Sequence, residues 1–310
     1  MGGVSEEREI SIQSGRCIAR ALKQADLDVV TSDVGPDNMD VLGDASTDVF
    51  FVALHGRFGE DGQLQQILED RSLIYTGSGP TASRLAFDKW ASKRAFAQAG
   101  VQTPQAIQLN GRTDMRQVEK KLQAFSDMFV IKPLRQGSSV GISIAGAADE
   151  AIAAARKCLS DFGDCMIEEF IPGREITVSI IEDQALPIIE IRSKTGFYDF
   201  HAKYIDERTE FLFDTIDDRR LIAKINAAAL DCFHALGCRH FARVDFILGD
   251  DGKPYALEVN TIPGFTSHSL LPKAAAKAGI SMSDLCRRIV EAALADNTAE
   301  PFVDTAINNR

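Results

Sequence analysis

The feature that most constrains the fold is a pair of short apolar runs near the end of the chain, joined by a turn sequence. Residues 241–248 and 255–260 have the pattern of two strands, and they flank the sequence GDDG at 249–252, which predicts a β-hairpin. Asp245 lies in the first run, and Glu258 and Asn260 lie two residues apart in the second. Because side chains two residues apart share one face of a strand, we expect the hairpin to gather all three.

These three side chains have the chemistry of a magnesium site. Two carboxylates and an amide oxygen are hard ligands, and Mg²⁺ completes such a set with water and substrate phosphates, which implies a nucleoside triphosphate. The alternative is three polar residues on an exposed sheet face, and spacing alone leaves the two readings nearly equal. An unpaired carboxylate within an apolar run would be costly, and this favours the metal site.

Arg243 lies two residues before Asp245 and therefore shares its face of the strand. A cation in that position can stabilise charge on a transferred phosphoryl group or on a tetrahedral oxyanion. The alternative is a structural ion pair with Asp245, because structural ion pairs are common too. The sequence leaves both alternatives open.

A second candidate phosphate site lies near the middle of the chain. Lys132 precedes a segment that contains Gly137, Ser138 and Ser139, so a cation and free backbone N–H groups come together. The segment is not a Walker A loop, whose sequence is absent from the chain. Many hairpins contain glycine and serine, so a plain connection between two strands is the alternative.

The sequence GSGPTA at residues 77–82 superficially fits a dinucleotide-binding turn. Such a turn needs an acidic residue about 20 positions further on to bind a ribose, and none follows here. We therefore interpret residues 77–82 as a turn at a domain boundary.

The first 77 residues have the pattern of an open parallel α/β domain. Residues 49–54 form a continuous apolar run, typical of a strand buried on both faces, and residues 73–75 predict a second strand. Helices are expected at 11–25 and from about residue 61, where Asp61 can cap the helix. Gly2 and Gly3 resemble a turn that follows a strand, yet only Met1 precedes them. We expect that this first strand is missing because the start codon was assigned too late or the chain was trimmed.

The remaining residues also alternate between helical and strand patterns. The chain of 310 residues is long enough for two or three domains. Gly100 and Gly237 are placed to end two of the helices. Helices are predicted at 81–99 and 217–236, and strands at 129–133, 141–144, 165–171, 175–181 and 186–191.

Composition excludes several functional classes. The formal net charge of -11 argues against a surface that binds nucleic acid or an anionic membrane. No apolar run approaches the ~20 residues that span a bilayer, and the first residues lack the apolar core of a signal peptide, so we expect a cytoplasmic protein. The six cysteines form no C-x-x-C pair and are expected to be reduced and mostly buried, and the five histidines form no metalloprotease motif.

Several motifs together resemble the D-alanine:D-alanine ligases, a family of the ATP-grasp superfamily. The resemblance runs nearly end to end, and its most specific part is HGRFGEDG at residues 55–62. The other matching segments are residues 2–11, 132–133 with 137–141, 198–199 with 203–204, 242–245, and 258–264.

The resemblance implies a fold of mixed α/β and α+β class, namely an ATP-grasp fold that follows the open parallel α/β domain. It divides the chain into an N-terminal substrate domain (1–77), a central ATP-grasp subdomain (78–172) and a C-terminal subdomain with the metal site (173–310). The implied reaction joins two D-alanines through an acyl phosphate for peptidoglycan precursor synthesis. Residues 195–210 would form a lid that excludes water, and a homodimer is expected.

The resemblance also implies roles for individual residues. Glu7 would bind the ammonium of the first D-alanine in a network with Ser138 and Tyr204, and His55 would lie beside that substrate. Arg243 and the Gly264 N–H would face the oxyanion. Lys89, Lys132, Ser139 and Lys203 would hold the ATP phosphates; Glu168, Ile171 and Glu175 would frame the adenosine; Phe197 would pack near the adenine; and Asp245, Glu258 and Asn260 would bind two Mg²⁺ ions, with Mn²⁺ as a substitute.

The second substrate is the main alternative that the resemblance leaves open. Ser269 and Leu270 would receive the carboxylate of a second D-alanine, although Ser269 could instead cap a helix before Pro272. Related enzymes join D-alanine to D-lactate or D-serine, and Tyr204 resembles the dipeptide-forming type. A weakly active or non-catalytic nucleotide-binding relative is a further alternative, but neither the metal ligands nor Arg243 are missing.

Overall fold

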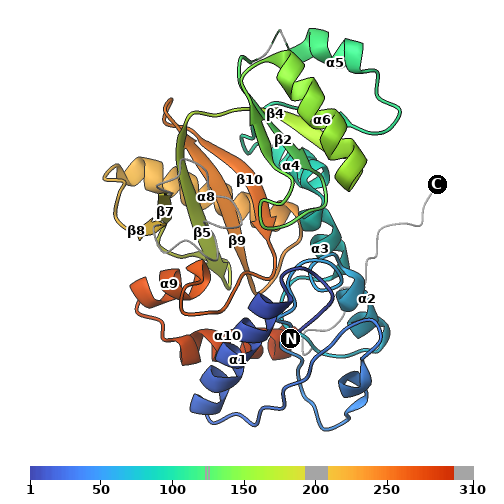
Figure 1. Ribbon diagram of the computed structural model, residues 1–310. Helices are drawn as coiled ribbons and strands as arrows, with labels where there is room; N and C mark the ends of the chain where they lie inside the picture. The colour runs from blue at the N-terminus through green and yellow to red at the C-terminus, as the bar shows by residue number, and fades with distance from the viewer. Residues whose placement is uncertain (123, 125, 193–208, 297–310) are drawn as a thin grey trace, which may run out of the picture.

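The computed structural model describes residues 1–122, 124, 126–192 and 209–296 of the chain. Figure 1 shows an N-terminal unit (residues 1–77, blue) at one end of the molecule and a four-stranded sheet with two helices at the other. A six-stranded sheet lies in the middle.

The six-stranded sheet contains the predicted hairpin. Its strands are antiparallel in the order β10-β9-β5-β7-β8, with β6 paired to β5. Asp245 pairs with Glu258 and Arg243 with Asn260, next to a register shift between Ala256 and Glu258, so the hairpin prediction is confirmed. The strands are β5 (Gly173–Ile181), β6 (Gln184–Ala185), β7 (Ile189–Arg192), β8 (Glu210–Leu212), β9 (Phe241–Gly249) and β10 (Pro254–Asn260).

Alternation along β9 gives the sheet two different faces. Val244 and Phe246 pack into a core with helix α8 (Arg219–Ala235), which confirms the helix predicted at 217–236. Phe241, on the other face, packs into a second core with the C-terminal helices. These helices, α9 (Leu270–Lys277) and α10 (Met282–Asp296), were not predicted from the sequence.

The four-stranded sheet forms a central unit with the helices α5 (Met115–Leu122) and α6 (Ala148–Phe162). Its order is β1-β4-β2-β3, and β2 and β3 form an antiparallel pair, as the sequence predicted. Strand β1 and both helices were not predicted. The strands are β1 (Ala106–Leu109), β2 (Phe129–Pro133), β3 (Ser143–Ala145) and β4 (Cys165–Glu169).

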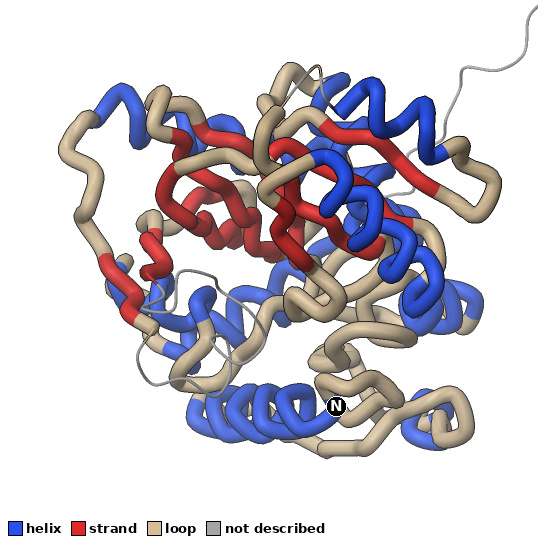
Figure 2. Tube along the Cα trace, turned by 45° about the horizontal axis from the view of Figure 1, so that its top comes forward, coloured by secondary structure: helices blue, strands red, loops and turns tan. Residues whose placement is uncertain are grey.

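The N-terminal unit differs from its prediction, because the expected parallel strands do not form continuous ladders. Figure 2 shows mostly loop here, apart from α1 (Arg8–Gln24), a short 3₁₀ helix η1 (Asp40–Gly43) and α2 (Gln63–Asp70). Single parallel bridges link Phe50 to Tyr75 and Gly2 to Val34. The prediction of paired parallel strands at 49–54 and 73–75 is therefore wrong, because only one bridge joins these segments. The helix expected from about residue 61 begins two residues later.

Side chains explain the missing ladder. The Val52 N–H donates to the Thr76 hydroxyl at 3.2 Å, and the Ser11 hydroxyl donates to the Ala53 carbonyl at 2.6 Å. The Ser5 hydroxyl donates to the His55 carbonyl, also at 2.6 Å. These side chains satisfy backbone groups that would otherwise pair with a neighbouring strand.

The single helix predicted at 81–99 is also wrong, because Asp88 divides it. Helix α3 (Pro80–Phe87) ends there and α4 (Lys89–Gln98) begins, with the Asp88 carboxylate accepting from the N–H groups of Trp90 and Ala91. Aspartate has a weak propensity for helix interiors and stabilises a helix when it caps the N-terminus. A helix start at Asp88 is therefore favoured over one continuous helix. The break places Lys89 at the first position of α4.

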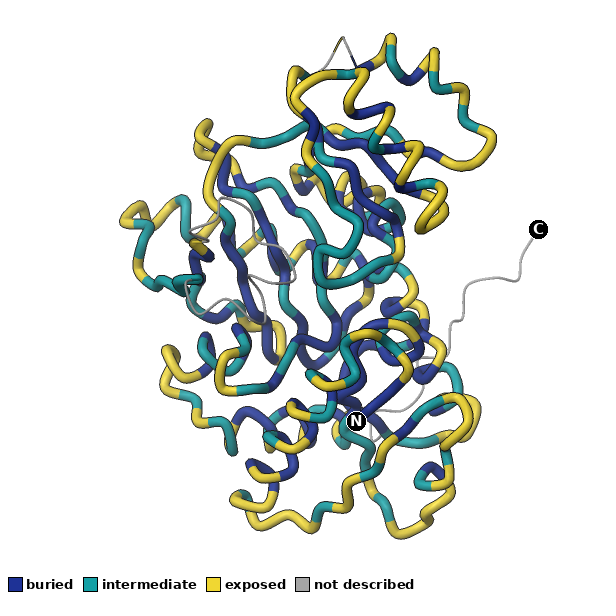
Figure 3. Tube along the Cα trace, viewed as in Figure 1, coloured by how far each residue is buried: buried dark blue, intermediate teal, exposed yellow. Residues whose placement is uncertain are grey.

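Burial agrees with the composition of the chain. Figure 3 shows buried residues along the strands and exposed residues on loops and outer helix faces. All six cysteines are free thiols and five are buried, as predicted. Within the described residues, no helix is both long enough and apolar enough to cross a membrane.

Candidate active site

A pocket lies where the β9–β10 hairpin, the connection between β2 and β3, and the N-terminal unit meet. Its empty volume, open solvent included, is about 1310 Å³. Eleven of the residues predicted for the site line it: Glu7, His55, Lys89, Ser138, Arg243, Asp245, Glu258, Asn260, Gly264, Ser269 and Leu270. Five others, Lys132, Ser139, Glu168, Ile171 and Glu175, lie outside this lining, and Phe197, Lys203 and Tyr204 lie outside the described residues, as does most of the expected lid.

Arg243 and Asp245 form a bidentate ion pair on β9. Nε and Nη2 of Arg243 lie 2.9 and 2.8 Å from the two carboxylate oxygens of Asp245. The Thr177 hydroxyl, on the adjacent strand β5, donates to the same carboxylate at 2.6 Å. The ion pair considered as an alternative is thus present, and Arg243 still lines the pocket. Thr177 was missed, because its position opposite Asp245 depends on the pairing of β5 with β9, which no motif in the sequence indicates.

The other two oxygen donors are also engaged. Glu258 pairs with the Lys89 ammonium at 2.9 Å, and Lys89 also donates to the Gln136 carbonyl at 2.7 Å. The Asn260 side-chain oxygen accepts from the Ile262 N–H at 3.1 Å. Among the described residues, no cluster of three or more histidines, cysteines, aspartates or glutamates could hold a metal. The candidate site therefore depends on the Asn260 amide as its third donor, and an all-oxygen set of this kind fits Mg²⁺.

Glu7 and Ser138 meet across the pocket, as the resemblance implied. The Ser138 hydroxyl donates to the Glu7 carboxylate from a left-handed backbone conformation with φ +52°. A side chain at Gly137 would place its Cβ 3.2 Å from the same carboxylate. Glycine at this position therefore allows the β2–β3 connection to approach Glu7 closely.

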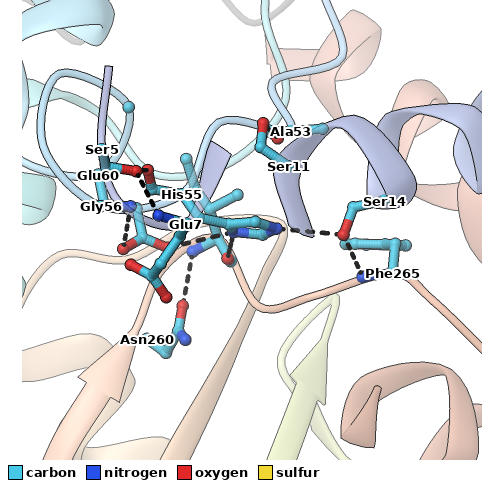
Figure 4. A network of polar contacts seen from close by, with 12 residues as sticks. Ser5, Glu7, Ser11, Ser14, Ala53, His55, Gly56, Glu60, Asn260 and Phe265 are labelled. Carbon is cyan, nitrogen blue, oxygen red and sulfur yellow. Dashed lines mark hydrogen bonds and ion pairs between the residues drawn. The ribbon is translucent and has the colours of Figure 1, made fainter. Parts of the chain in front are cut away.

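His55 joins the N-terminal unit to the loop after β10 (Figure 4). Its Nδ1 donates to the Ile262 carbonyl at 2.9 Å, and its Nε2 lies 3.1 Å from the Ser14 hydroxyl, which accepts from the Phe265 N–H. Burial alone would lower the pKa of His55, but the Glu60 carboxylate, 3.5 Å away, the Glu7 carboxylate and the hydrogen bond to Ile262 together outweigh burial and raise that pKa.

Ser269 stands at the N-cap position of α9, yet its hydroxyl does not cap the helix. It accepts from the Thr266 N–H at 3.0 Å and lies 2.9 Å from the Thr266 hydroxyl. A Cβ at Gly264 would lie 2.6 Å from the Ser269 hydroxyl, so glycine is required for this approach. Gly264 and Ser269 therefore share one corner of the pocket with Leu270.

Lys132 and Glu168 form a buried ion pair behind the pocket, and Lys93 joins it. Lys93 lies 2.8 Å from the second carboxylate oxygen of Glu168 and was missed in the sequence. Burial alone would raise the pKa of Glu168, but the two ammonium groups outweigh it and lower the pKa. Nearby, half-buried Ile171 lies between β4 and β5, and Glu175 pairs with Ile191 and Ile247 in the sheet.

Two antiparallel sheets that contribute to one pocket give the chain an ATP-grasp fold. A family model described as D-ala D-ala ligase C-terminus matches residues 96–291. The chain is 42% identical to a D-alanine–D-alanine ligase of Syntrophotalea carbinolica and 44% identical to one of Magnetococcus marinus, covering 94% of this chain in each case and 94% and 95% of the relatives. The chain belongs to the D-alanine–D-alanine ligase family.

Solved structures agree with this assignment. The D-alanine–D-alanine ligase of Bacillus anthracis complexed with ATP superposes with a TM-score of 0.83 at 36% identity, covering 96% of this chain and 95% of that one. A D-Ala:D-Ser ligase from Enterococcus faecalis has a TM-score of 0.81 at 26% identity, covering 94% of this chain and 97% of that one.

Proposed function

We propose that this chain is an ATP-dependent ligase that joins two D-alanines to D-alanyl-D-alanine for peptidoglycan precursor synthesis. The observation that carries this proposal is the identity of 42% over 94% of a relative named D-alanine–D-alanine ligase. The pocket supports it by collecting both cations and carboxylates within one opening between the two sheets and the N-terminal unit.

The first step activates the carboxylate of the first D-alanine. A carboxylate oxygen attacks the γ-phosphorus of ATP, an O–P bond forms, and the bond to the bridging oxygen breaks to release ADP. Glu7 binds the substrate ammonium, supported by Ser138 and Tyr204, with His55 beside it. Phosphate oxygens of ATP are bound by three cationic side chains and one serine, namely Lys89, Lys132, Lys203 and Ser139.

The second step forms the peptide bond. The amine nitrogen of the second D-alanine attacks the acyl carbon, and the resulting tetrahedral centre collapses with loss of inorganic phosphate and of an amine proton. Arg243 and the Gly264 N–H stabilise the oxyanion of that centre. Ser269 and Leu270 bind the carboxylate of the second D-alanine.

Asp245, Glu258 and Asn260 would hold two Mg²⁺ ions, with Mn²⁺ as a substitute. Bound metal would neutralise charge between the substrate carboxylate and the phosphates. Lys89 neutralises Glu258 and lines the same pocket, where its ammonium can also bind phosphate oxygens.

The adenosine of ATP binds between four residues, Glu168, Ile171, Glu175 and Phe197. In support, Glu168 is paired with Lys132, one of the lysines proposed to bind the ATP phosphates. Residues 195–210, which include Lys203 and Tyr204, act as the lid that keeps water from the acyl phosphate.

The proposal extends to the organisation of the chain. We place the domain boundaries after residues 77 and 172, so that the N-terminal domain binds substrate and the other two enclose ATP. The protein is a cytoplasmic homodimer without nucleic-acid or membrane partners, in keeping with its net charge of -11. Sedimentation of the purified protein tests the dimer.

A phosphate-release assay with ATP, Mg²⁺ and one amino acid at a time tests the function. D-alanine should stimulate phosphate release and L-alanine should not, and mass spectrometry should detect D-alanyl-D-alanine. Mixtures of D-alanine with D-lactate or D-serine test the alternatives at neutral pH, and a mixed product as the major species would replace the proposed specificity. No stimulation by D-alanine would refute the ligase itself. Chelation of divalent metal should abolish release.

A further inference from the structure

Three buried charges form a cluster between α4, β2 and β4. Lys93, Lys132 and Glu168 have exposed fractions of 8%, 5% and 2%. Both lysines pair with the single carboxylate, Lys132 through Oε2 and Lys93 through Oε1 at 2.8 Å. Two positive charges and one negative charge leave this buried cluster with a net charge of +1, which favours binding of a further anion.

The cluster adjoins the pocket through α4. Lys89 and Lys93 lie four residues apart and therefore on one side of the helix. Lys89 lines the pocket, and its backbone N–H donates to the Leu134 carbonyl at 3.0 Å, immediately after the end of β2. Lys132 is the penultimate residue of β2, and the chain after this strand reaches the pocket at Gln136 to Ser138.

The two lysines are held differently. The Lys93 ammonium contacts Glu168 and also donates to the Pro104 carbonyl at 2.6 Å, so two groups fix its position. Among the described residues, the Lys132 ammonium contacts Glu168 alone. Lys132 can therefore turn toward another anion by side-chain rotation, whereas Lys93 remains in place.

Movement of Lys132 has a cost that depends on Lys93. If Lys132 left Glu168 and no other cation were present, a carboxylate 2% exposed would be unpaired, which is strongly unfavourable. Lys93 removes this cost because it continues to neutralise the carboxylate. Burial, with a smaller effect of Lys132, lowers the pKa of Lys93 despite its pairing with Glu168, so the position is costly for a cation.

We propose that Lys93 is a positioning residue of the nucleotide site, which keeps Glu168 neutralised so that Lys132 can exchange that carboxylate for a phosphate of ATP. The inference rests on the proposed use of ATP. It assigns Lys93 an effect on ATP affinity and none on the binding of D-alanine.

Calorimetric titration with a non-hydrolysable ATP analogue and Mg²⁺ tests the proposal in the full-length protein. Lys93→Met should weaken binding about tenfold or more, because Lys132 then stays on Glu168. The KM for ATP should rise by a similar factor, whereas the KM for D-alanine should not change. Arg94→Met is the matched control, since it removes one positive charge from the exposed face of the same helix and should leave both constants unchanged. Lys93→Arg should restore much of the affinity.

A double variant separates this role from a merely structural one. In a Glu168→Gln background there is no buried anion to neutralise, so adding Lys93→Met should change ATP affinity less than about twofold. An undiminished effect of Lys93→Met in that background would overturn the inference, as would wild-type affinity in Lys93→Met itself. If Lys93→Met fails to fold, Lys93→Gln, which removes the charge but keeps a donor for the Pro104 carbonyl, replaces it in both comparisons. A wild-type protein that does not bind the analogue would instead refute the proposed function.

Discussion

The two walls of the pocket are built in different ways. The β9–β10 wall carries Arg243, Asp245, Glu258 and Asn260 on an antiparallel ladder with one register shift, between Ala256 and Glu258, and backbone pairing sets the positions of these side chains. The N-terminal wall presents Glu7 and His55 from segments that single bridges and side-chain hydrogen bonds hold in place.

This difference indicates where the site is sensitive. A ladder is supported by many backbone hydrogen bonds, so loss of one neighbouring side chain changes its geometry little. The N-terminal wall depends on a few hydroxyl and carboxylate groups, among them Ser14 and Glu60. Substitutions on the ladder should therefore affect chemistry with little loss of stability, whereas substitutions that support the N-terminal wall should affect stability and substrate binding together.

The largest expected loss of activity comes from a substitution on the β9–β10 wall. Asp245→Asn removes a candidate metal ligand and weakens the hold on Arg243, so kcat/KM should fall by about 10³-fold. Asparagine retains an acceptor for Thr177, and thermal melting should therefore stay close to that of the wild type. Asp250→Asn, in the exposed turn of the same hairpin, is the control and should be fully active. Near-normal phosphate release by Asp245→Asn would remove the basis for a metal site on this wall.

Glu7→Gln provides the equivalent test of the N-terminal wall. Because it removes the charge that pairs with the substrate ammonium, the KM for the first D-alanine should rise about 10- to 100-fold. The KM for ATP should not change, and Glu6→Gln, which alters the exposed neighbouring residue, should behave as wild type. The initial-rate dependence on D-alanine measures this effect. An equal rise in both KM values would show that Glu7 acts on the whole site.

Elements with a regular period were predictable from the sequence, and those decided by side chains were not. The hairpin itself was predictable from the period of two and the turn, but these alone would place Asp245 opposite Leu257. The register shift between Ala256 and Glu258 brings Glu258 opposite Asp245 instead. The strand expected at 49–54 failed because Ser5, Ser11 and Thr76 satisfy its backbone groups. The helix expected at 81–99 failed because a capping aspartate looks like any exposed helical residue until its backbone partners are known.

The same distinction applies to the site. Residues in spaced motifs, such as Arg243 with Asp245, were predicted to share a face and do so. Ser14, Lys93 and Thr177 lie singly within helices or strands, and no spacing identifies them. Their partners are 251, 75 and 68 positions away, for Ser14 with Phe265, Lys93 with Glu168 and Thr177 with Asp245, so only the folded arrangement reveals them.

Ser14→Ala and Thr177→Val sharpen the comparison as a pair. Ser14→Ala leaves the buried Phe265 N–H without its acceptor, so the free energy of unfolding should fall by about 1–3 kcal/mol. Thr177→Val should cost about 1 kcal/mol or less, because Asp245 retains both hydrogen bonds from Arg243. Urea denaturation followed by circular dichroism measures both. If Thr177→Val lowered the free energy of unfolding more than Ser14→Ala, the N-terminal wall would not be the one that depends on single side chains.

The smallest expected effect is a pair of opposite pH dependences, and it comes from two buried histidines. Burial, together with the charge of Arg239, lowers the pKa of His240 below its ordinary value of 6.5 and outweighs the opposite effect of Asp296. The geometry requires the neutral ring, because Nδ1 of His240 accepts from the Gly77 N–H at 3.0 Å and so cannot carry a proton. In contrast, the pKa of His55 is raised, and its charged ring can donate hydrogen bonds from Nε2 to the Ser14 hydroxyl and from Nδ1 to the Ile262 carbonyl.

The sign of each contribution to stability follows from these shifts. For His240, the folded pKa is depressed, so its contribution is full above pH 6.5 and is lost as the pH falls through the folded value. For His55, the folded pKa is raised, so its contribution is full below pH 6.5 and is lost as the pH rises through the folded value. His240→Gln should therefore flatten the acidic side of the stability profile, and His55→Gln should flatten the side above pH 6.5. Urea midpoints measured from pH 5 to pH 8 for the three proteins test this, and matching slopes for both variants would show that neither histidine is held as the hydrogen bonds indicate.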